Sequence, residues 1–409
     1  MYSKPDSSLI NLMLLVIIEV MGIGIVFPML PELFILKDSI FLDNNTPDAV
    51  RYLYYGLSIG LWPLGMFFGT PYWGEVSDKV GRKKIFLLCL TMTAVSYGFS
   101  GIAIYLQSIW LFLFSRLFSG FFAGCYEIAH ASAADISTPE NKARNMGWIV
   151  LSLGIGFTIG PLITTFFTIK VFSPDFGITA PFGTACILSL TNALTILLFF
   201  RETFQPDRKH HINLTKIFSS FLFVFIDKRL TYLSIIFFCM VSAWTAFFIG
   251  LPLFLSALFQ LDTAGIGFLY FLIGLSNIVS MLFVQPYILK LFSLKKTVIY
   301  SALFCTLFLL MLIVIPLLSA ISVCLIIFTL IELLTYSSFL AVFSNAVTHK
   351  EQGKTMGGSA SVSSAATLIS TMGAVQLANF GTRLPIILSA FLFFFIAILM
   401  IKYKPLKDS

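Results

Sequence analysis

The sequence predicts an all-α membrane protein whose twelve transmembrane helices form two pseudo-symmetric bundles of six. Of its 409 residues, 58% are hydrophobic and only 11% are charged, and the mean hydropathy is +0.95. A soluble core does not need so much apolar surface, whereas a polytopic membrane protein does. Apolar runs of about twenty residues, each long enough to cross a bilayer as a helix, recur along the chain. They fall into two groups of six, separated by the most polar stretch of the sequence.

The expected helices follow from these runs in chain order. The first six lie near residues 8–34, 51–73, 85–106, 109–134, 146–168 and 181–200, and the second six near 230–257, 265–288, 297–318, 320–345, 357–378 and 384–402. We therefore expect an N-terminal six-helix bundle over 1–200, a cytoplasmic linker with an interfacial helix over 201–229, and a C-terminal six-helix bundle over 230–409. Pro71-Tyr72 and Pro286-Tyr287 precede lysine pairs at equivalent places in the helix order. A parallel repeat predicts such echoes and places a substrate site between the halves.

The basic residues predict the orientation of the chain. Most of the 26 lysines and arginines fall in connections on one side if both termini are cytoplasmic, as the positive-inside rule requires. The sequence thus predicts a multi-pass protein of a bacterial-type cytoplasmic (inner) membrane, with lipid as its partner, and we expect a monomer. The net charge of +7 is explained by these loops, so no nucleic acid partner is expected. The first run lacks the pattern of a cleaved signal peptide and is expected to be retained.

Enzyme and metal signatures are absent from the sequence. The six cysteines fall inside apolar runs without CxxC or Cys/His metal spacing, and the adjacent His210 and His211 of the charged linker are the kind of pair that is usually just solvated. No Walker loop, nucleophile elbow or dinucleotide fingerprint occurs. We therefore expect a protein that is not an enzyme, holds no metal and needs no cofactor, with a proton gradient as its energy source.

A basic, glycine-punctuated stretch, residues 74–84, joins the second and third expected helices. We expect a loop in which Gly74 and Gly81 allow the backbone to turn. Asp78 and Arg82 are four residues apart, within reach of an ion pair, and Asp78 can sit against the positive end of another helix. The alternative is that the stretch only sets the membrane topology.

Glu19 lies inside the first apolar run. At 1.5 Å per residue it is roughly 16 Å from the start of that helix, near the bilayer midplane. Ionisable groups at this depth are costly and are functional candidates. Because burial favours the neutral form of a carboxyl group, Glu19 can act as a proton carrier. It is our first candidate for proton coupling, and a structural hydrogen bond is the alternative.

The fourth run carries three ionisable residues. Arg116 and Glu127 are about three helical turns apart and are expected on one face, and Glu127 and His130 are neighbours on that helix. Glu127 and His130 could bind a cationic substrate group, relay protons or satisfy one another as a structural pair.

The second half of the chain holds further polar candidates. Glu332 lies in the middle of the tenth run with Tyr336 one turn away, and we hold it as a second proton or substrate contact. Asn277 in the eighth run is a polar group at depth, of the type that more often only bonds helix to helix.

Several motifs resemble those of one transporter family. The pattern Gly74-x3-Asp78-Lys79-x-Gly81-Arg82-Lys83 resembles the signature loop of the major facilitator superfamily. Arg116-x3-Gly120-x3-Gly124 resembles its span-four motif, and Gly156-x3-Gly160-Pro161 the motif associated with its proton-coupled antiporters. Residues 21–31 and Arg201-Glu202-Thr203 are similar to the tetracycline and multidrug exporter branch.

The resemblance implies the major facilitator fold and transport by rocking of two six-helix halves. It implies proton-driven export of a small organic compound, with Glu19 and Arg116 in proton transfer and Glu127 or Glu332 as partner. It further implies that Asp78 ties the halves together in the outward-open state. The stretch Gly156–Pro161 would form an interface with a helix of the second half.

The chain also departs from the family pattern. Tetracycline exporters carry further acidic and histidine residues in spans three, eight and nine, where this chain has Ser96, Asn277 and Cys305. Its proton-coupling apparatus is therefore expected to differ, which argues against tetracycline as the substrate. Two alternatives to export remain: import of a metabolite or siderophore-like solute by proton symport, and a non-transporting membrane sensor on the same fold.

Overall fold

The computed structural model describes residues 7–36, 39–138, 141–169, 174–203, 224–347 and 352–403, and all regular secondary structure within these ranges is helical. The chain divides into two compact units. The first unit comprises Met1–Pro47, Leu57–Leu214 and Leu261–Gly274, and the second comprises Asp48–Gly56, Thr215–Gln260 and Leu275–Ser409. The expected boundaries at 1–200, 201–229 and 230–409 stay a prediction. Most of the linker, including the expected interfacial helix, His210 and His211, lies outside the described residues.

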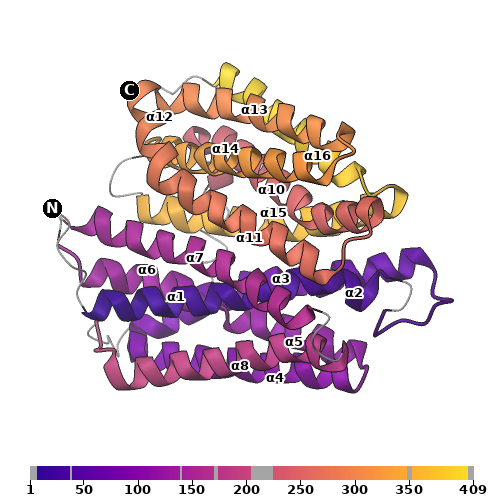
Figure 1. Ribbon diagram of the computed structural model, residues 1–409. Coiled ribbons are helices and arrows are strands. Elements are labelled where there is room, and N and C mark those ends of the chain that lie inside the picture. The colour runs from indigo at the N-terminus through magenta and orange to yellow at the C-terminus, as the bar shows by residue number, and fades with distance from the viewer. Residues whose placement is uncertain are drawn as a thin grey trace. The chain divides into compact units, whose positions relative to one another are not determined.

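Helices follow one another along both halves of the sequence (Figure 1). In the first half they are α1 (Ser7–Val26), the short 3₁₀ turn η1 (Phe27–Met29), α2 (Leu30–Phe34), α3 (Asp48–Val80), α4 (Arg82–Tyr105), α5 (Ile109–Phe122), α6 (Cys125–Asp135), α7 (Lys142–Thr168) and α8 (Pro174–Phe199). In the second half they are α10 (Lys228–Phe259), α11 (Thr263–Val279), the π-helical turn η2 (Ser280–Val284), α12 (Gln285–Leu291), α13 (Leu294–Val314), α14 (Leu318–Ser344), α15 (Gln352–Phe380) and α16 (Leu384–Lys402).

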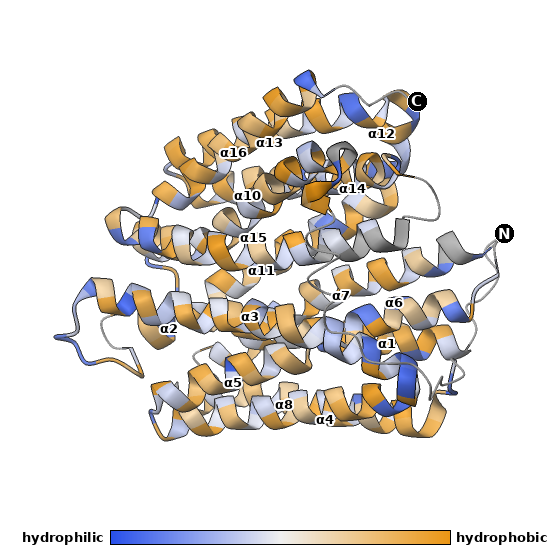
Figure 2. Ribbon diagram, turned by 180° about the vertical axis from the view of Figure 1, so that it is seen from behind, coloured by the Kyte–Doolittle hydropathy of each residue, from blue (hydrophilic) through white to orange (hydrophobic). Residues whose placement is uncertain are grey.

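The lengths of these helices fit a bilayer. Ten helical segments of the described chain are long and apolar enough to cross a membrane. Of the remaining long helices, α3 has 33 residues and α15 has 29, and a span needs only about 20. Each expected helix thus has a counterpart, which confirms the all-α membrane fold. Figure 2 shows that the helices are mostly hydrophobic and that the hydrophilic residues gather at their ends and in the connections.

The first unit is built around α1. This helix packs along α7 and α8, and α4 packs against α5 and α8 (Figure 1). Glycines let two further helices approach closely, as expected where lipid removes the hydrophobic drive for association. A Cβ atom on Gly65 of α3 would lie within 2.8 Å of the backbone of Gly120 on α5, and one on Gly124 would lie 3.2 Å from the Cβ of Trp73.

The second unit is joined by hydroxyl groups as well as by apolar contacts. There α13 packs against α14 and α16, and α10 packs against α15 and α16. The hydroxyl groups of Ser370 and Ser389 donate to the carbonyl oxygens of Ser242 (2.9 Å) and Ala243 (2.7 Å) on α10. These bonds satisfy polar groups where no water is available.

The expected loop at residues 74–84 is largely helical. Helix α3 continues through Gly74 to Val80, and Gly81 alone separates it from α4. The expected turn at Gly74 is therefore wrong, because one glycine inside a helix lowers its stability without ending it. Gly81, by contrast, has a φ of 101°, a conformation that only glycine adopts readily, and makes the whole turn.

The fourth expected helix is interrupted. Helix α5 ends at Phe122 and α6 begins at Cys125, while Ala123 leaves the helical conformation with a ψ of 41°. The expectation that Arg116 and Glu127 share a face assumed a continuous helix and is not supported across this break. Arg116 is buried and Glu127 is exposed.

Candidate functional site

Glu19 lies at the end of another helix. It sits on α1 with 9% of its surface exposed, and the backbone N–H of Cys125, the first residue of α6, donates a hydrogen bond to its carboxyl group. The first N–H groups of a helix have no partner within that helix and carry partial positive charge. The break in the fourth span therefore presents N–H donors to a carboxyl group inside the membrane.

The Glu19 carboxyl group is incompletely paired. Its Oε2 atom is buried and has no hydrogen-bond partner among the residues that the structure describes. In the same residues, no ion pair within 4.0 Å involves Glu19. Glu127, in the first turn of α6, lies close enough to interact electrostatically with Glu19. Two carboxyl groups, one buried and one exposed, thus interact electrostatically with no ion-pair partner for either in the part of the chain that the structure describes.

His130 contacts a methionine and a tyrosine. Its Nδ1 atom lies 3.4 Å from Sδ of Met146 on α7, and its ring packs edge-on against Tyr126 with centroids 4.7 Å apart. In the described part of the chain it forms no ion pair with Glu127, so nothing there supports the structural-pair alternative. The first turns of α6 combine an exposed carboxyl group with two partly buried aromatic rings.

Arg116 is buried on α5. Only 3% of its surface is exposed, and its Nε donates to the carbonyl oxygen of Ser58 on α3 at 3.0 Å. Tyr97 of α4, which is not among the residues predicted from the sequence, interacts electrostatically with both Arg116 and Glu19. A tyrosine inside an apolar run looks like a packing residue, so the sequence carried no signal for it.

The candidates of the second half belong to the second unit. Glu332 on α14 is 5% exposed and interacts electrostatically with Cys305 of α13. Tyr336 packs its ring 6.1 Å from that of Phe237 on α10. Asn277 on α11 has a buried Oδ1 for which the described residues provide no hydrogen-bond partner. The second unit therefore also buries a carboxyl group, that of Glu332, and an amide oxygen, that of Asn277, which has no hydrogen-bond partner among the described residues.

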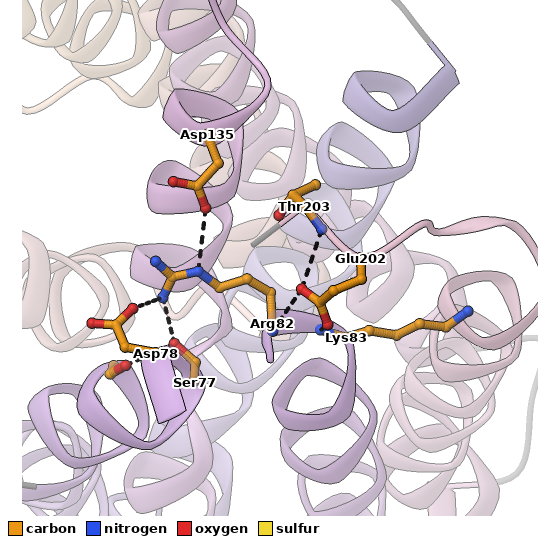
Figure 3. Close-up of polar contacts among 8 residues, drawn as sticks. Ser77, Asp78, Arg82, Lys83, Asp135, Glu202 and Thr203 are labelled. Atoms are coloured by element: carbon orange, nitrogen blue, oxygen red, sulfur yellow. Dashed lines mark hydrogen bonds and ion pairs between the residues drawn. The ribbon is translucent and has the colours of Figure 1, made fainter. Parts of the chain in front are cut away.

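The basic stretch forms a polar network at the ends of several helices (Figure 3). Arg82 pairs with Asp78 at 2.7 Å and with Asp135, at the end of α6, at 3.4 Å. Glu202, just after α8, accepts the backbone N–H of Arg82 at 2.9 Å and that of Lys83 at 3.1 Å. Glu202 thereby caps the first turn of α4, where a negative charge is stabilising.

The glycines of span five pack α7 onto α1. A Cβ on Gly156 would lie 2.6 Å from the carbonyl oxygen of Ile17, and one on Gly160 would lie 2.5 Å from that of Met21. Neither position has room for a larger residue. A hydrogen bond from Thr164 to the carbonyl oxygen of Ile25, 2.7 Å long, extends the same contact.

A helix of the second half of the sequence meets the other side of α7. The start of α11 belongs to the first unit, and its Gly267 lies against Pro161 and Thr165 of α7. The Thr165 hydroxyl donates to the carbonyl oxygen of Ala264 at 3.2 Å. The resemblance implied such an interface for Gly156, Gly160 and Pro161. Pro161 does contact α11, but the glycine that allows α7 and α11 to approach closely is Gly267 of α11.

Comparisons with known proteins agree with this architecture. The family model described as Major Facilitator Superfamily matches residues 12–371. The tetracycline resistance protein, class B, of Escherichia coli is 26% identical over 191 residues, which are 47% of this chain and 43% of that protein. The match thus spans less than half the length of this relative.

Two solved structures show the same fold. The human organic anion transporter MFSD10 (TETRAN) has a TM-score of 0.73 at 18% identity, with 97% of this chain and 100% of that chain covered. A D-xylose-proton symporter has a TM-score of 0.73 at 13% identity, with 98% of both chains covered. With the family match over most of its length, the chain belongs to the Major Facilitator Superfamily, whose members are transporters and not enzymes.

Proposed function

We propose that this protein is a proton-coupled secondary transporter of the cytoplasmic membrane that exports a small organic compound by alternating access, as an antiporter. The observation that carries the proposal is the state of Glu19. Its carboxyl group lies inside the first spanning helix with a buried oxygen that the described chain leaves unpaired. A carboxyl group that served only structure would have its oxygens bonded, because an unpaired polar atom inside a membrane is costly.

The surroundings of Glu19 support both of its charge states. The N-terminus of α6 stabilises the carboxylate, whereas burial favours the protonated form. Glu127 is exposed and close by, so it is placed to exchange a proton with water and with Glu19. Similarity to a tetracycline resistance protein, together with the span-five glycines, favours export over import.

The orientation that the basic residues predict assigns the ends of the helices to the two sides of the membrane. With both termini in the cytoplasm, the Arg82 network lies on the cytoplasmic side and the start of α11 on the outer side. Protons would then reach Glu19 from outside and leave inward as the substrate is carried out. Helix α7, packed on α1 through Gly156 and Gly160, would transmit the change of charge on Glu19 to its contact with α11.

Reconstituted protein tests the proposal. The full chain in liposomes loaded with a fluorescent pH indicator is given a pH gradient and challenged with tetracycline, ethidium, fluorescein and D-xylose. We expect at least one probe to move opposite to protons, and Glu19→Gln to abolish the gradient-driven flux while probe exchange without a gradient persists. The matched control is Asp43→Asn, which neutralises an exposed carboxyl group in the connection after α2.

The outcomes separate the alternatives. Flux that ignores the gradient, or that survives Glu19→Gln unchanged, contradicts proton coupling through Glu19. Movement of the probe in the same direction as protons identifies a symporter instead. Binding of a probe without any flux identifies a non-transporting sensor.

A further inference from the structure

Tyr97 lies between the two charged groups of the first unit that the proposed function uses. It is on α4, and 4% of its surface is exposed. Its hydroxyl group interacts electrostatically with Arg116 of α5 and with Glu19 of α1.

The hydroxyl group of Tyr97 fills a place where α1 has no side chain. A Cβ atom on Gly22 would overlap with Oη of Tyr97. Gly22 follows Glu19 by three residues, and residues at this spacing are neighbours on one helix face. Because α1 has a glycine at this position, the phenol hydroxyl can reach the face that carries Glu19, one turn away from it.

Hydrogen bonds join α4 to α5 next to Tyr97 in the sequence. The Ser96 hydroxyl donates to the carbonyl oxygen of Ser115 at 2.8 Å, and the Ser100 and Ser115 hydroxyl groups lie 2.7 Å apart. Ser115 directly precedes Arg116, and Ser96 directly precedes Tyr97. These bonds therefore hold the phenol and the guanidinium group in one register inside the membrane.

Arg116 approaches Tyr97 as a buried cation. The described residues offer it no carboxylate within 4.0 Å, and its bond to the carbonyl oxygen of Ser58 uses only one of its five N–H donors. A phenol hydroxyl can accept a hydrogen bond and donate one at the same time. Tyr97 is thus of the right chemical type to connect a cation to a carboxylate.

We propose that Tyr97 is a positioning residue that connects the charge of Arg116 to the protonation of Glu19. In this proposal, the hydroxyl oxygen of Tyr97 accepts from the Arg116 guanidinium group, and its proton turns to the unpaired oxygen of Glu19 when that carboxyl group becomes ionised. When Glu19 takes up a proton, it no longer accepts this bond as a carboxylate, and the connection weakens. Tyr97 keeps its own proton throughout, so no covalent step is involved. The inference rests on the proposed role of Glu19 and adds to it the residue that sets its affinity for protons.

Other groups also face Glu19 and enter the same titration. From α6 these are Glu127 and the thiol of Cys125, which in turn contacts Cys89 of α4. From α8, the Asn192 amide donates to the backbone of α1 at 3.2 Å and does not titrate. The part of α7 packed against α1 contributes the uncharged Gly156 and Gly160. Arg116 is therefore the cation of this group, and Tyr97 connects it to Glu19.

Infrared difference spectroscopy of the purified full chain in lipid tests the inference without a substrate. The protonated-carboxyl band that Glu19→Gln removes reports the titration of Glu19. We expect Tyr97→Phe to raise the midpoint of this titration by about one pH unit, because the ionised form of Glu19 loses a hydrogen bond and a bond to a charged group corresponds to that shift. The control Tyr55→Phe removes a buried hydroxyl that donates to the carbonyl oxygen of Ile249 in the second unit. It should leave the midpoint where it is.

A double-mutant cycle with Arg116→Gln completes the test. If Tyr97 connects the two charges, Tyr97→Phe has little further effect in the Arg116→Gln background, because coupled residues are not additive. Gly22→Ala, which displaces the hydroxyl, should resemble Tyr97→Phe. A midpoint in Tyr97→Phe equal to that of the wild type, or a shift of equal size in both backgrounds, overturns the inference. Proton-driven flux that survives Glu19→Gln would instead overturn the proposed function, which the infrared titration does not measure.

Discussion

Two groups of charged residues in the first unit follow opposite rules. At the ends of α3, α4 and α6, Arg82 is paired with Asp78 and Asp135, and Glu202 caps α4 with both carboxylate oxygens. Around Glu19, one carboxylate oxygen has no partner among the described residues and no cation lies within ion-pair distance. The two groups differ in pairing rather than in residue type.

This difference teaches which charges hold the protein together and which are free to change. Removing one member of a paired network leaves the others with an uncompensated charge, and the fold loses stability. An unpaired ionisable group already has an unfavourable free energy, so a neutral replacement has little stability to remove. The comparison therefore predicts that substitutions in the Arg82 network lower stability. A neutral replacement of Glu19 should leave stability nearly unchanged and abolish gradient-driven transport.

The largest effect on stability is expected at Arg82. Arg82→Gln leaves Asp78 and Asp135 without their shared cation and should lower the free energy of unfolding by about 2 kcal/mol. This is less than for a fully buried pair, because 37% of the Asp78 side chain is exposed. The apparent melting temperature of the purified protein in detergent measures it. Lys84→Gln, at an exposed position two residues along the same helix, is the control, and equal melting temperatures for the two variants would contradict the structural role of the network.

An intermediate effect is expected from the two glycines of the same stretch. Gly81→Ala forces a side chain into a φ of 101° and should cost about 1 to 2 kcal/mol. Gly74→Ala lies inside α3, where a Cβ meets nothing within 4 Å, and should stabilise the protein by about 0.5–1 kcal/mol. The same melting measurement checks both. Similar losses in the two variants would mean that both glycines turn the chain, as the sequence alone suggested.

The sequence predicts the helices of this protein well because the bilayer imposes a simple requirement on their length and hydrophobicity. A helix that crosses the membrane needs about twenty predominantly apolar residues, and such runs are visible in the sequence without knowledge of the fold. The four-residue spacing of Asp78 and Arg82 was also enough to predict their ion pair. These features depend on residues that are close together in the chain.

Features that depend on packing between helices were not visible in the sequence. The break after Phe122 accompanies the approach of Gly120 and Gly124 to Trp62 and Trp73 of α3, and the sequence does not specify that approach. The place of Tyr97 beside Glu19 requires that the side of α1 bearing Gly22 faces α4. Both features build the candidate site, so the site was predicted less completely than the fold.

The smallest effect on stability, and the sharpest use of the comparison, is expected at Glu19. Glu19→Gln keeps the size of the side chain and can still accept the Cys125 N–H, so the free energy of unfolding should change by less than about 0.5 kcal/mol. The same variant is expected to lose gradient-driven transport, so stability and transport are separated at one residue. The melting temperature of Glu19→Gln, measured beside that of Arg82→Gln, checks the expectation. A loss as large as that of Arg82→Gln would show that Glu19 is held by interactions as complete as those of the Arg82 network, and the free carboxyl group on which proton coupling depends would not exist.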